Sequence, residues 1–151
     1  NLDAFTIGGT KNGALFGEAL VITNPALDVD FRYYMKQRGA LLAKGRLLGI
    51  QFSALLEDDL YLELARHANA LANRMQDGIE KLGYGFMIKT PTNQIFPIFP
   101  NRVLSQLSRS CDYETQKEID GENTCVRFVT SWATPAAAAD KFLEDLAGIK
   151  N

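Results

Sequence analysis

The stretch FTIGGTKNGALFGEALVIT, residues 5–23, joins two runs of apolar and β-branched residues through a glycine-rich segment. The runs at 2–7 and 18–23 predict two β-strands. Asn12-Gly13 between them is a strong hairpin signal, because a type I′ turn needs a positive φ at both central residues. In that interpretation Lys11 is a solvated residue of a tight turn. The alternative is that the glycines admit a second group close to the backbone and that Lys11 acts chemically.

A phosphate-binding loop of the P-loop type is excluded, because it needs four residues between its glycines and then Lys-Ser or Lys-Thr. The chemical interpretation rests on the surroundings of the lysine. A lysine at a strand end, crowded by Phe5 and Ile7, is expected to be desolvated, so that its neutral amine can form a Schiff base. Thr10 places a hydroxyl group beside it. The local pattern alone favours the hairpin turn.

The rest of the chain alternates between helical and strand-like patterns, which predicts an α/β or α+β protein. The clearest helix is 59–82, where apolar residues recur every three or four positions and Gly83 follows as a C-cap. Pro97 cannot donate a ladder hydrogen bond, so its strand is expected to be an edge strand or bulged. The other predicted helices are 26–37, 41–56 and 101–109. The last predicted helix has Thr134 as its N-cap and Pro135 at its first position, and it ends near residue 147. The other predicted strands are 84–88, 94–99, 112–119 and 124–130.

Composition narrows the function classes. The chain has 151 residues, 46% of them hydrophobic and 23% charged, and a net charge of −2, which argues against a nucleic-acid partner. No apolar run reaches the ~18 residues that span a bilayer, so no membrane partner is expected. With one histidine, no metal site is expected. Cys111 and Cys125 are expected to be free thiols of a cytoplasmic protein, although a disulfide remains an alternative. The chain opens inside a strand-like run, so we expect it to be part of a longer protein.

Arg127 is the second candidate for chemistry. On a strand it points with Cys125 and Val129 and away from Val126 and Phe128. A guanidinium among apolar neighbours needs an anion, and its planar fork can make two charge-assisted bonds to a carboxylate. The strand alone favours a structural salt bridge with a nearby acid, and binding of a substrate carboxylate is the alternative.

GGTKNG (8–13) followed by EALVI (18–22) resembles the cofactor-lysine segment of the threonine aldolases, pyridoxal-phosphate (PLP) enzymes of the aspartate-aminotransferase fold. The resemblance continues through 36–75, through TNQIFPIFPN (92–101) and through VRFVTSWAT (126–134). It implies an α/β fold in which residues 1–58 form the end of a large PLP-binding α/β domain with its interdomain helix. Residues 59–151 would form a small C-terminal α+β domain.

The resemblance also implies roles for individual residues. Lys11 would carry PLP, and Arg127 would hold the carboxylate of the amino-acid substrate. Thr10 and Asn12 flank the lysine as cofactor-supporting candidates. The basic cluster in this region comprises Lys36, Arg38, Lys44 and Arg46. Some members of the family read Gly-Gly-Gly-Met-Arg here, whereas this chain reads GALLAKGR. Lys44 is our candidate from this cluster for a phosphate contact across a subunit interface. His67 is expected to be structural.

The implied function is a PLP-dependent lyase that cleaves L-threonine or a similar β-hydroxy amino acid to glycine and an aldehyde through a Schiff base on Lys11. The family's pyridine-nitrogen aspartate, ring-stacking histidine and first phosphate loop precede the cofactor lysine. The chain therefore resembles the C-terminal part of such an enzyme, which is expected to be a homodimer or homotetramer. The alternatives are another PLP reaction on this fold, such as β-elimination or racemisation, and a non-catalytic fragment that mediates dimerisation.

Overall fold

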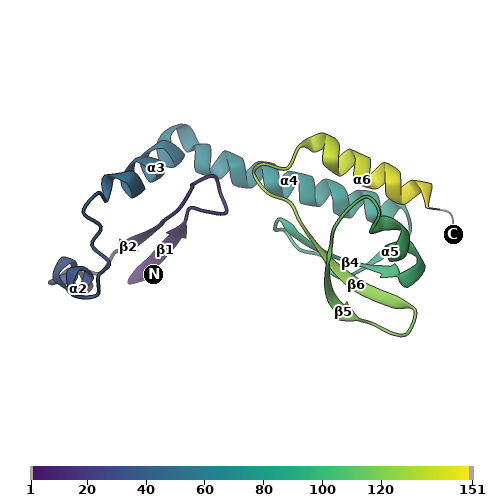
Figure 1. Ribbon diagram of the computed structural model, residues 1–151, viewed down its shortest axis with the longest axis horizontal. Helices are drawn as coiled ribbons and strands as arrows, with labels where there is room; N and C mark the ends of the chain where they lie inside the picture. The colour runs from purple at the N-terminus through teal and green to yellow at the C-terminus, as the bar shows by residue number, and fades with distance from the viewer. Residues whose placement is uncertain (1, 150–151) are drawn as a thin grey trace. The chain divides into compact units, whose positions relative to one another are not determined.

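The computed structural model describes residues 2–149, and these divide into two compact units with the boundary after Leu64. Both units combine helices with sheets, which confirms the predicted fold class (Figure 1). The first unit contains β1 (Ala4–Gly8), β2 (Glu18–Ile22), α1 (Pro25–Asp28), α2 (Phe31–Gln37), α3 (Arg46–Leu56), the 3-10 turn η1 (Glu57–Asp59) and the start of α4 (Leu60–Lys81). The second contains the rest of α4, β3 (Gly85–Ile88), β4 (Gln94–Pro100), α5 (Asn101–Leu107), β5 (Glu114–Glu118), β6 (Asn123–Val129) and α6 (Ala136–Gly148).

In the first unit, β1 and β2 pair antiparallel from Ala4 opposite Ile22 to Gly8 opposite Glu18. The two-residue turn expected at Asn12-Gly13 is wrong. The strands are joined instead by the longer loop 9–17, which we call the lysine loop. Only Gly13 of the two central residues has a positive φ, of 102°, whereas a type I′ turn needs both.

The helical region after β2 is more broken than its pattern predicts. The helix expected over 26–37 is two short helices, because Asp30 adopts a left-handed conformation with φ 56°. Aspartate tolerates that conformation better than most residues. The helix expected from residue 41 begins only at Arg46, after Gly45 as its N-cap.

The second unit is a four-stranded antiparallel sheet in the order β3-β4-β6-β5, with α4 and α6 packed together (Figure 1). Gly78 of α4 lies against the side chain of Leu143 of α6, and Arg74 forms an ion pair with Asp140. The core between helices and sheet is strongly apolar. Its least exposed members include Ala72, Ile79, Ile95, Phe99, Val103, Leu107, Val126 and Leu146.

In this unit the Pro97 strand was expected to be an edge strand or bulged, and the second alternative is confirmed, whereas the predicted N-cap of the last helix needs correction. The strand with Pro97 is not an edge strand, since β4 lies between β3 and β6. Its pairing with β3 is irregular, because the register shifts between Phe86 and Ile88, as the missing donor of Pro97 allows. The last helix begins at Ala136 with Pro135 as N-cap, and the Thr134 hydroxyl instead accepts a 2.8 Å hydrogen bond from the amide of Ser131.

Candidate functional site

The lysine loop is fixed on one side by α4. The Asn12 side-chain amide donates to the backbone carbonyl of Tyr61 at 2.8 Å, and the Tyr61 phenol donates to the carbonyl of Gly8 at 2.9 Å. Tyr61 therefore contacts the chain on both sides of Lys11. Asn12, a candidate for supporting the cofactor, uses its amide to hold the loop.

The other side of the loop is fixed by α3. The Gln51 side-chain oxygen accepts from the amide of Leu15 at 2.8 Å, and its nitrogen donates to the carbonyl of Phe16 at 3.2 Å. Sequence reasoning missed both Gln51 and Tyr61. The available signal for Gln51 was a polar residue in the middle of the largely apolar helix 46–56, whereas nothing in the local pattern singles out Tyr61.

Lys11 lies in this loop and is exposed. Phe5 is itself 39% exposed, so the expected desolvation of the lysine by Phe5 and Ile7 is wrong within this unit. Among the described residues, no hydrogen bond or ion pair occupies the Lys11 amine. The loop thus presents an accessible amine on a backbone that is tied down at both ends.

The two glycines before Lys11 have different surroundings. A Cβ atom on buried Gly9 would lie 2.9 Å from the Cβ of Ala14 and 3.0 Å from the carbonyl oxygen of Gly17. A Cβ atom on Gly8 would meet nothing within 4 Å. Gly9 is therefore required by packing, whereas nothing in the described chain requires Gly8. The open space beside Gly8 leaves room for another group.

The remaining cofactor candidates are exposed. Thr10 lies beside Lys11 in the loop, and Lys44 lies in the turn that precedes α3. Next to the loop, a cavity of about 400 Å³ is lined by β1 and by the η1–α4 region. Its lining includes Gly8 and Tyr61, while Asp59 is its one charged residue in the described chain.

Arg127 occupies β6 in the second unit, directly opposite Glu114 of β5. Its neighbours Val126 and Phe128 are buried in the core, so Arg127 belongs to the outer face of the sheet, as the alternation predicted. Its Nε atom is buried and has no hydrogen-bond partner in the described chain. The structural salt bridge is not formed, because the described ion pairs do not include Arg127. Buried donors without a partner are uncommon in folded proteins, so this atom needs an explanation.

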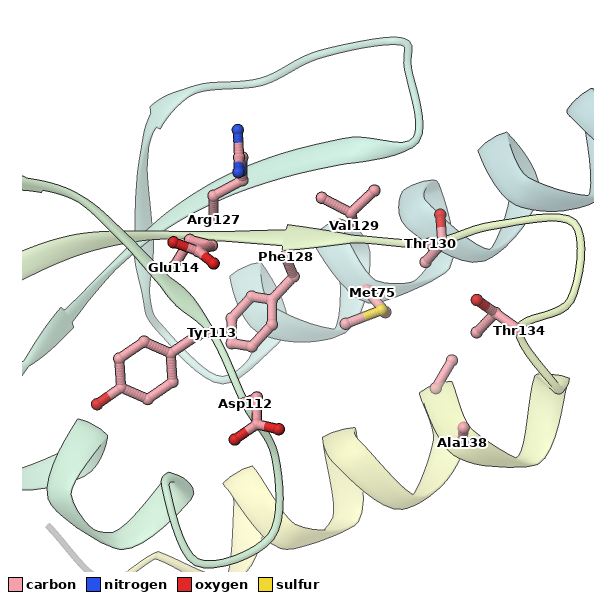
Figure 2. A pocket seen from close by; sticks show the side chains of 11 residues that line it. Met75, Asp112, Tyr113, Glu114, Arg127, Phe128, Val129, Thr130, Thr134 and Ala138 are labelled. Atoms are coloured by element: carbon pink, nitrogen blue, oxygen red, sulfur yellow. The ribbon is translucent and has the colours of Figure 1, made fainter. Parts of the chain in front are cut away.

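A cavity of about 330 Å³ adjoins the end of β6 (Figure 2). Met75 and Phe128 line it with apolar surface, and Asp112 and Thr134 add polar groups. Figure 2 shows the Arg127 guanidinium directed away from Phe128 and Met75. Although Arg127 contributes to the lining, the cavity is therefore separate from the surface that its guanidinium faces.

The segment that follows Arg127 is attached to α4. The Thr130 hydroxyl donates to the carbonyl of Ala68 at 2.7 Å, and Thr130 is 3% exposed. His67 Nε2 lies 2.8 Å from the carbonyl of Thr134, which requires the tautomer with the proton on Nε2. His67 thus makes a structural hydrogen bond, which fits its expected role.

Both cysteines are free. Burial, with a smaller contribution from nearby Asp112 and Asp145, raises the pKa of the Cys111 thiol, and burial also raises the pKa of the Cys125 thiol. Neither thiol is therefore activated as a nucleophile. The described residues contain no cluster of His, Cys, Asp or Glu that could hold a metal ion. None of the described helices has both the length and the apolarity needed to cross a membrane.

Comparison with known proteins places this arrangement in a family. The chain is 32% identical over 149 residues to a low specificity L-threonine aldolase of Pseudomonas sp., and 31% identical over 147 residues to one of Pseudomonas aeruginosa. These matches cover 98% and 96% of the chain. The structure superposes on a threonine aldolase of Leishmania major with a TM-score of 0.89 and 42% identity over 95% of the chain. No family model matches the sequence.

The fold and these matches thus define the chain as part of an α/β protein related to aldolases, as the resemblance implied. More narrowly, the chain belongs with the threonine aldolases and corresponds to their C-terminal part. It spans only 42% and 41% of the length of the two Pseudomonas relatives, and 42% of the Leishmania chain.

Proposed function

We propose that the full-length protein is a PLP-dependent aldolase that cleaves L-threonine or a similar β-hydroxy amino acid to glycine and an aldehyde. In this proposal residues 1–58 complete the large cofactor-binding domain and residues 59–151 form the small domain. Bound PLP would supply an electron sink for the cleaved Cα–Cβ bond, which amino-acid side chains lack. The relatives' names support the reaction, and their matches span nearly all of this chain.

Lys11 is the proposed attachment point for PLP. The observation that carries the proposal is the lysine loop, which holds an unpaired amine on a backbone fixed by Gln51 and Tyr61. The open space at Gly8 fits the close approach of a planar group. Thr10 is the proposed source of a hydroxyl contact to the cofactor, and Lys44 is the proposed phosphate ligand across a subunit interface.

Arg127 is the proposed carboxylate ligand. A guanidinium binds a carboxylate through two parallel charge-assisted hydrogen bonds, which orients the bound amino acid as well as holding it. The guanidinium supports this role because its charge is not compensated by any ion pair within the described chain, and a substrate carboxylate would compensate it.

The location and assembly are also proposals. Two free cysteines support a reducing compartment, and we infer a cytoplasmic enzyme. The first unit exposes large apolar side chains, including Leu15 at 87% and Tyr33 at 77%, which supports burial against further protein in a homodimer or homotetramer.

The test is chemical mapping of the cofactor on the full-length protein. Borohydride reduction fixes the lysine–cofactor linkage, and mass spectrometry locates the pyridoxyl label. We expect one label per chain on Lys11 and its loss in Lys11→Ala. The matched control is Lys81→Ala, at an exposed position of α4, and this variant should keep the label. Stoichiometric label on another lysine of the unmodified protein would refute the assignment.

A further inference from the structure

Glu114 is the cross-strand partner of Arg127 on β5. The two residues are directly opposite each other in the antiparallel pairing of β5 with β6 (Figure 2). Residues in such a pair project from the same face of the sheet, with Cβ atoms about 4.5–5.5 Å apart. Any anion that Arg127 binds on this face therefore lies close to the carboxylate of Glu114.

Arg127 and Glu114 do not compensate each other's charge through an ion pair. Although their charges are opposite, Glu114 is exposed and forms no ion pair with Arg127 in the described chain. The Nε of Arg127 stays buried without a partner. Glu114 thus leaves the guanidinium available to a ligand but contributes a negative charge at its side.

The other charges of β5 define a matched comparison. Lys117 is opposite Cys125, so it shares the outer face with Arg127, while Glu118 is opposite Thr124. Because side chains alternate along a strand, Thr124 projects from the face opposite to Cys125. Glu118 therefore carries the same charge on the same strand but projects from the face that Arg127 does not use.

We propose that Glu114 sets the charge selectivity of the carboxylate site by repelling ligands that carry a second negative charge beside the carboxylate held by Arg127. This rests on the proposed function of Arg127. A neutral amino acid brings one carboxylate, which the guanidinium compensates. A dicarboxylic amino acid brings another, which meets Glu114 with no further cation from Arg127. Specificity of this kind is obtained by repulsion of the wrong ligand rather than by added contacts with the right one.

The expected size follows from the exposure of the pair. Two like charges about 7 Å apart in a medium between protein and water give roughly a threefold to tenfold difference in affinity. The effect should weaken at high salt, because exposed charges are screened over about 8–10 Å at ordinary ionic strength.

The experiment compares L-asparagine with L-aspartate, which have nearly the same shape and differ by one charge. Binding to the full-length holoenzyme is measured by calorimetry or by the cofactor spectrum, so no turnover is needed. We expect the ratio of the two dissociation constants, aspartate over asparagine, to fall about threefold to tenfold in Glu114→Gln. It should stay at the unmodified value in Glu114→Asp, which keeps the charge, and in the control Glu118→Gln.

The variant Arg127→Lys distinguishes a failure of the proposed carboxylate site from a failure of the role proposed for Glu114. If it weakens asparagine binding while Glu114→Gln leaves the ratio unchanged, Arg127 holds the carboxylate and the role of Glu114 is refuted. If Arg127→Lys leaves the binding of both amino acids unchanged, the proposed carboxylate site fails and the inference fails with it. An equal change of the ratio in Glu118→Gln would also overturn the inference, because it would show a general effect of net charge.

Discussion

The phenol of Tyr61 donates a 2.9 Å hydrogen bond to the carbonyl oxygen of Gly8, and so attaches the first turn of α4 to the strand that leads into Lys11. The backbone carbonyl of the same tyrosine accepts from Asn12, beyond the lysine. We infer that Tyr61 fixes the position of the Lys11 backbone. A side chain at a reactive position must be held closely, because small displacements of reacting groups are costly in rate.

Tyr61→Phe should therefore loosen the lysine loop while keeping the aromatic packing. Losing one hydrogen bond costs about 1 kcal/mol, so we expect the affinity of the full-length protein for PLP to fall about fivefold. PLP titration followed by absorbance measures this. Tyr33→Phe is the control, because Tyr33 is 77% exposed and should leave the affinity unchanged. Equal affinities in Tyr61→Phe and the unmodified protein would show that the bond does not position the lysine.

Gly8 and Gly9 are adjacent but should respond differently to alanine. A Cβ on Gly9 would overlap Ala14 and the carbonyl of Gly17, so Gly9→Ala should lower the free energy of unfolding by about 1–3 kcal/mol. Gly8→Ala meets no atom within 4 Å and should leave stability unchanged, yet it should weaken PLP binding if the cofactor uses that space. Urea unfolding and PLP titration of both variants check the pair. Equal loss of stability in the two variants would contradict the distinction.

Arg127→Lys should weaken the binding of amino acids more than the binding of PLP. Lysine keeps the charge but cannot reproduce the bidentate geometry. Losing one partner of a desolvated, hydrogen-bonded charge pair costs about 2–5 kcal/mol, which is about 30-fold or more in the dissociation constant of glycine. Glycine titration against the cofactor spectrum measures it, with the exposed Arg109→Lys as control. An unchanged glycine affinity would leave Arg127 without a role in substrate binding.

The long periodic elements of this fold were predictable from sequence, and the irregular ones were not. The helix expected over 59–82 is α4 at Leu60–Lys81, because its apolar repeat faces the core and Gly83 ends it with φ 89°. The turn at Asn12-Gly13 was wrong because contacts from distant Gln51 and Tyr61 override a local preference. The strand of Pro97 was expected to lie at an edge or to be bulged, and the register shift in its pairing with β3 confirms the second alternative inside the sheet.

The residues of the candidate site were also predictable only in part. Lys11 and Arg127 were found as motifs, and the alternation along β6 gave the face of Arg127 correctly. Glu114 was not found, because its importance depends on the register of β5 against β6. Strand register is set by long-range pairing and by the β5–β6 turn, and a single sequence does not display it.

Asp120 should make stability depend on pH in the acidic range. Its carboxylate accepts hydrogen bonds of 2.8 Å from the amides of Glu122 and Asn123 in the turn between β5 and β6. The bond from Glu122, followed by that from the Asn123 side chain, lowers the pKa of Asp120. A lowered pKa in the folded state means that the contribution to stability is present above the unfolded pKa of about 4 and is lost as the pH falls through the folded value.

Asp120→Asn keeps an acceptor oxygen but removes the charge. We expect the stability difference between the unmodified protein and this variant to shrink as the pH falls below about 4. Thermal melts at closely spaced pH values from neutral to acid measure it. The control is Asp77→Asn, which removes the same charge at an exposed position of α4, away from this turn. A stability difference for Asp120→Asn that stays constant across the acidic range would contradict the assignment.

Thr130 should couple the stability of the second unit to the carboxylate site. Its hydroxyl donates to the carbonyl of Ala68 in α4, and the bond lies three residues beyond Arg127 on the same segment. Thr130→Val keeps the shape but places a methyl group where the hydroxyl was. We expect a loss of about 1 kcal/mol in the free energy of unfolding. We also expect a fewfold weaker affinity for glycine, because the end of β6 is no longer fixed to the helix. Urea unfolding and glycine titration of the full-length protein measure the two effects.

Thr115→Val is the control for this prediction, since Thr115 is exposed on β5 and its hydroxyl makes no side-chain hydrogen bond within the described chain. Reduced stability with an unchanged glycine affinity would show that Thr130 supports the fold alone and does not position Arg127.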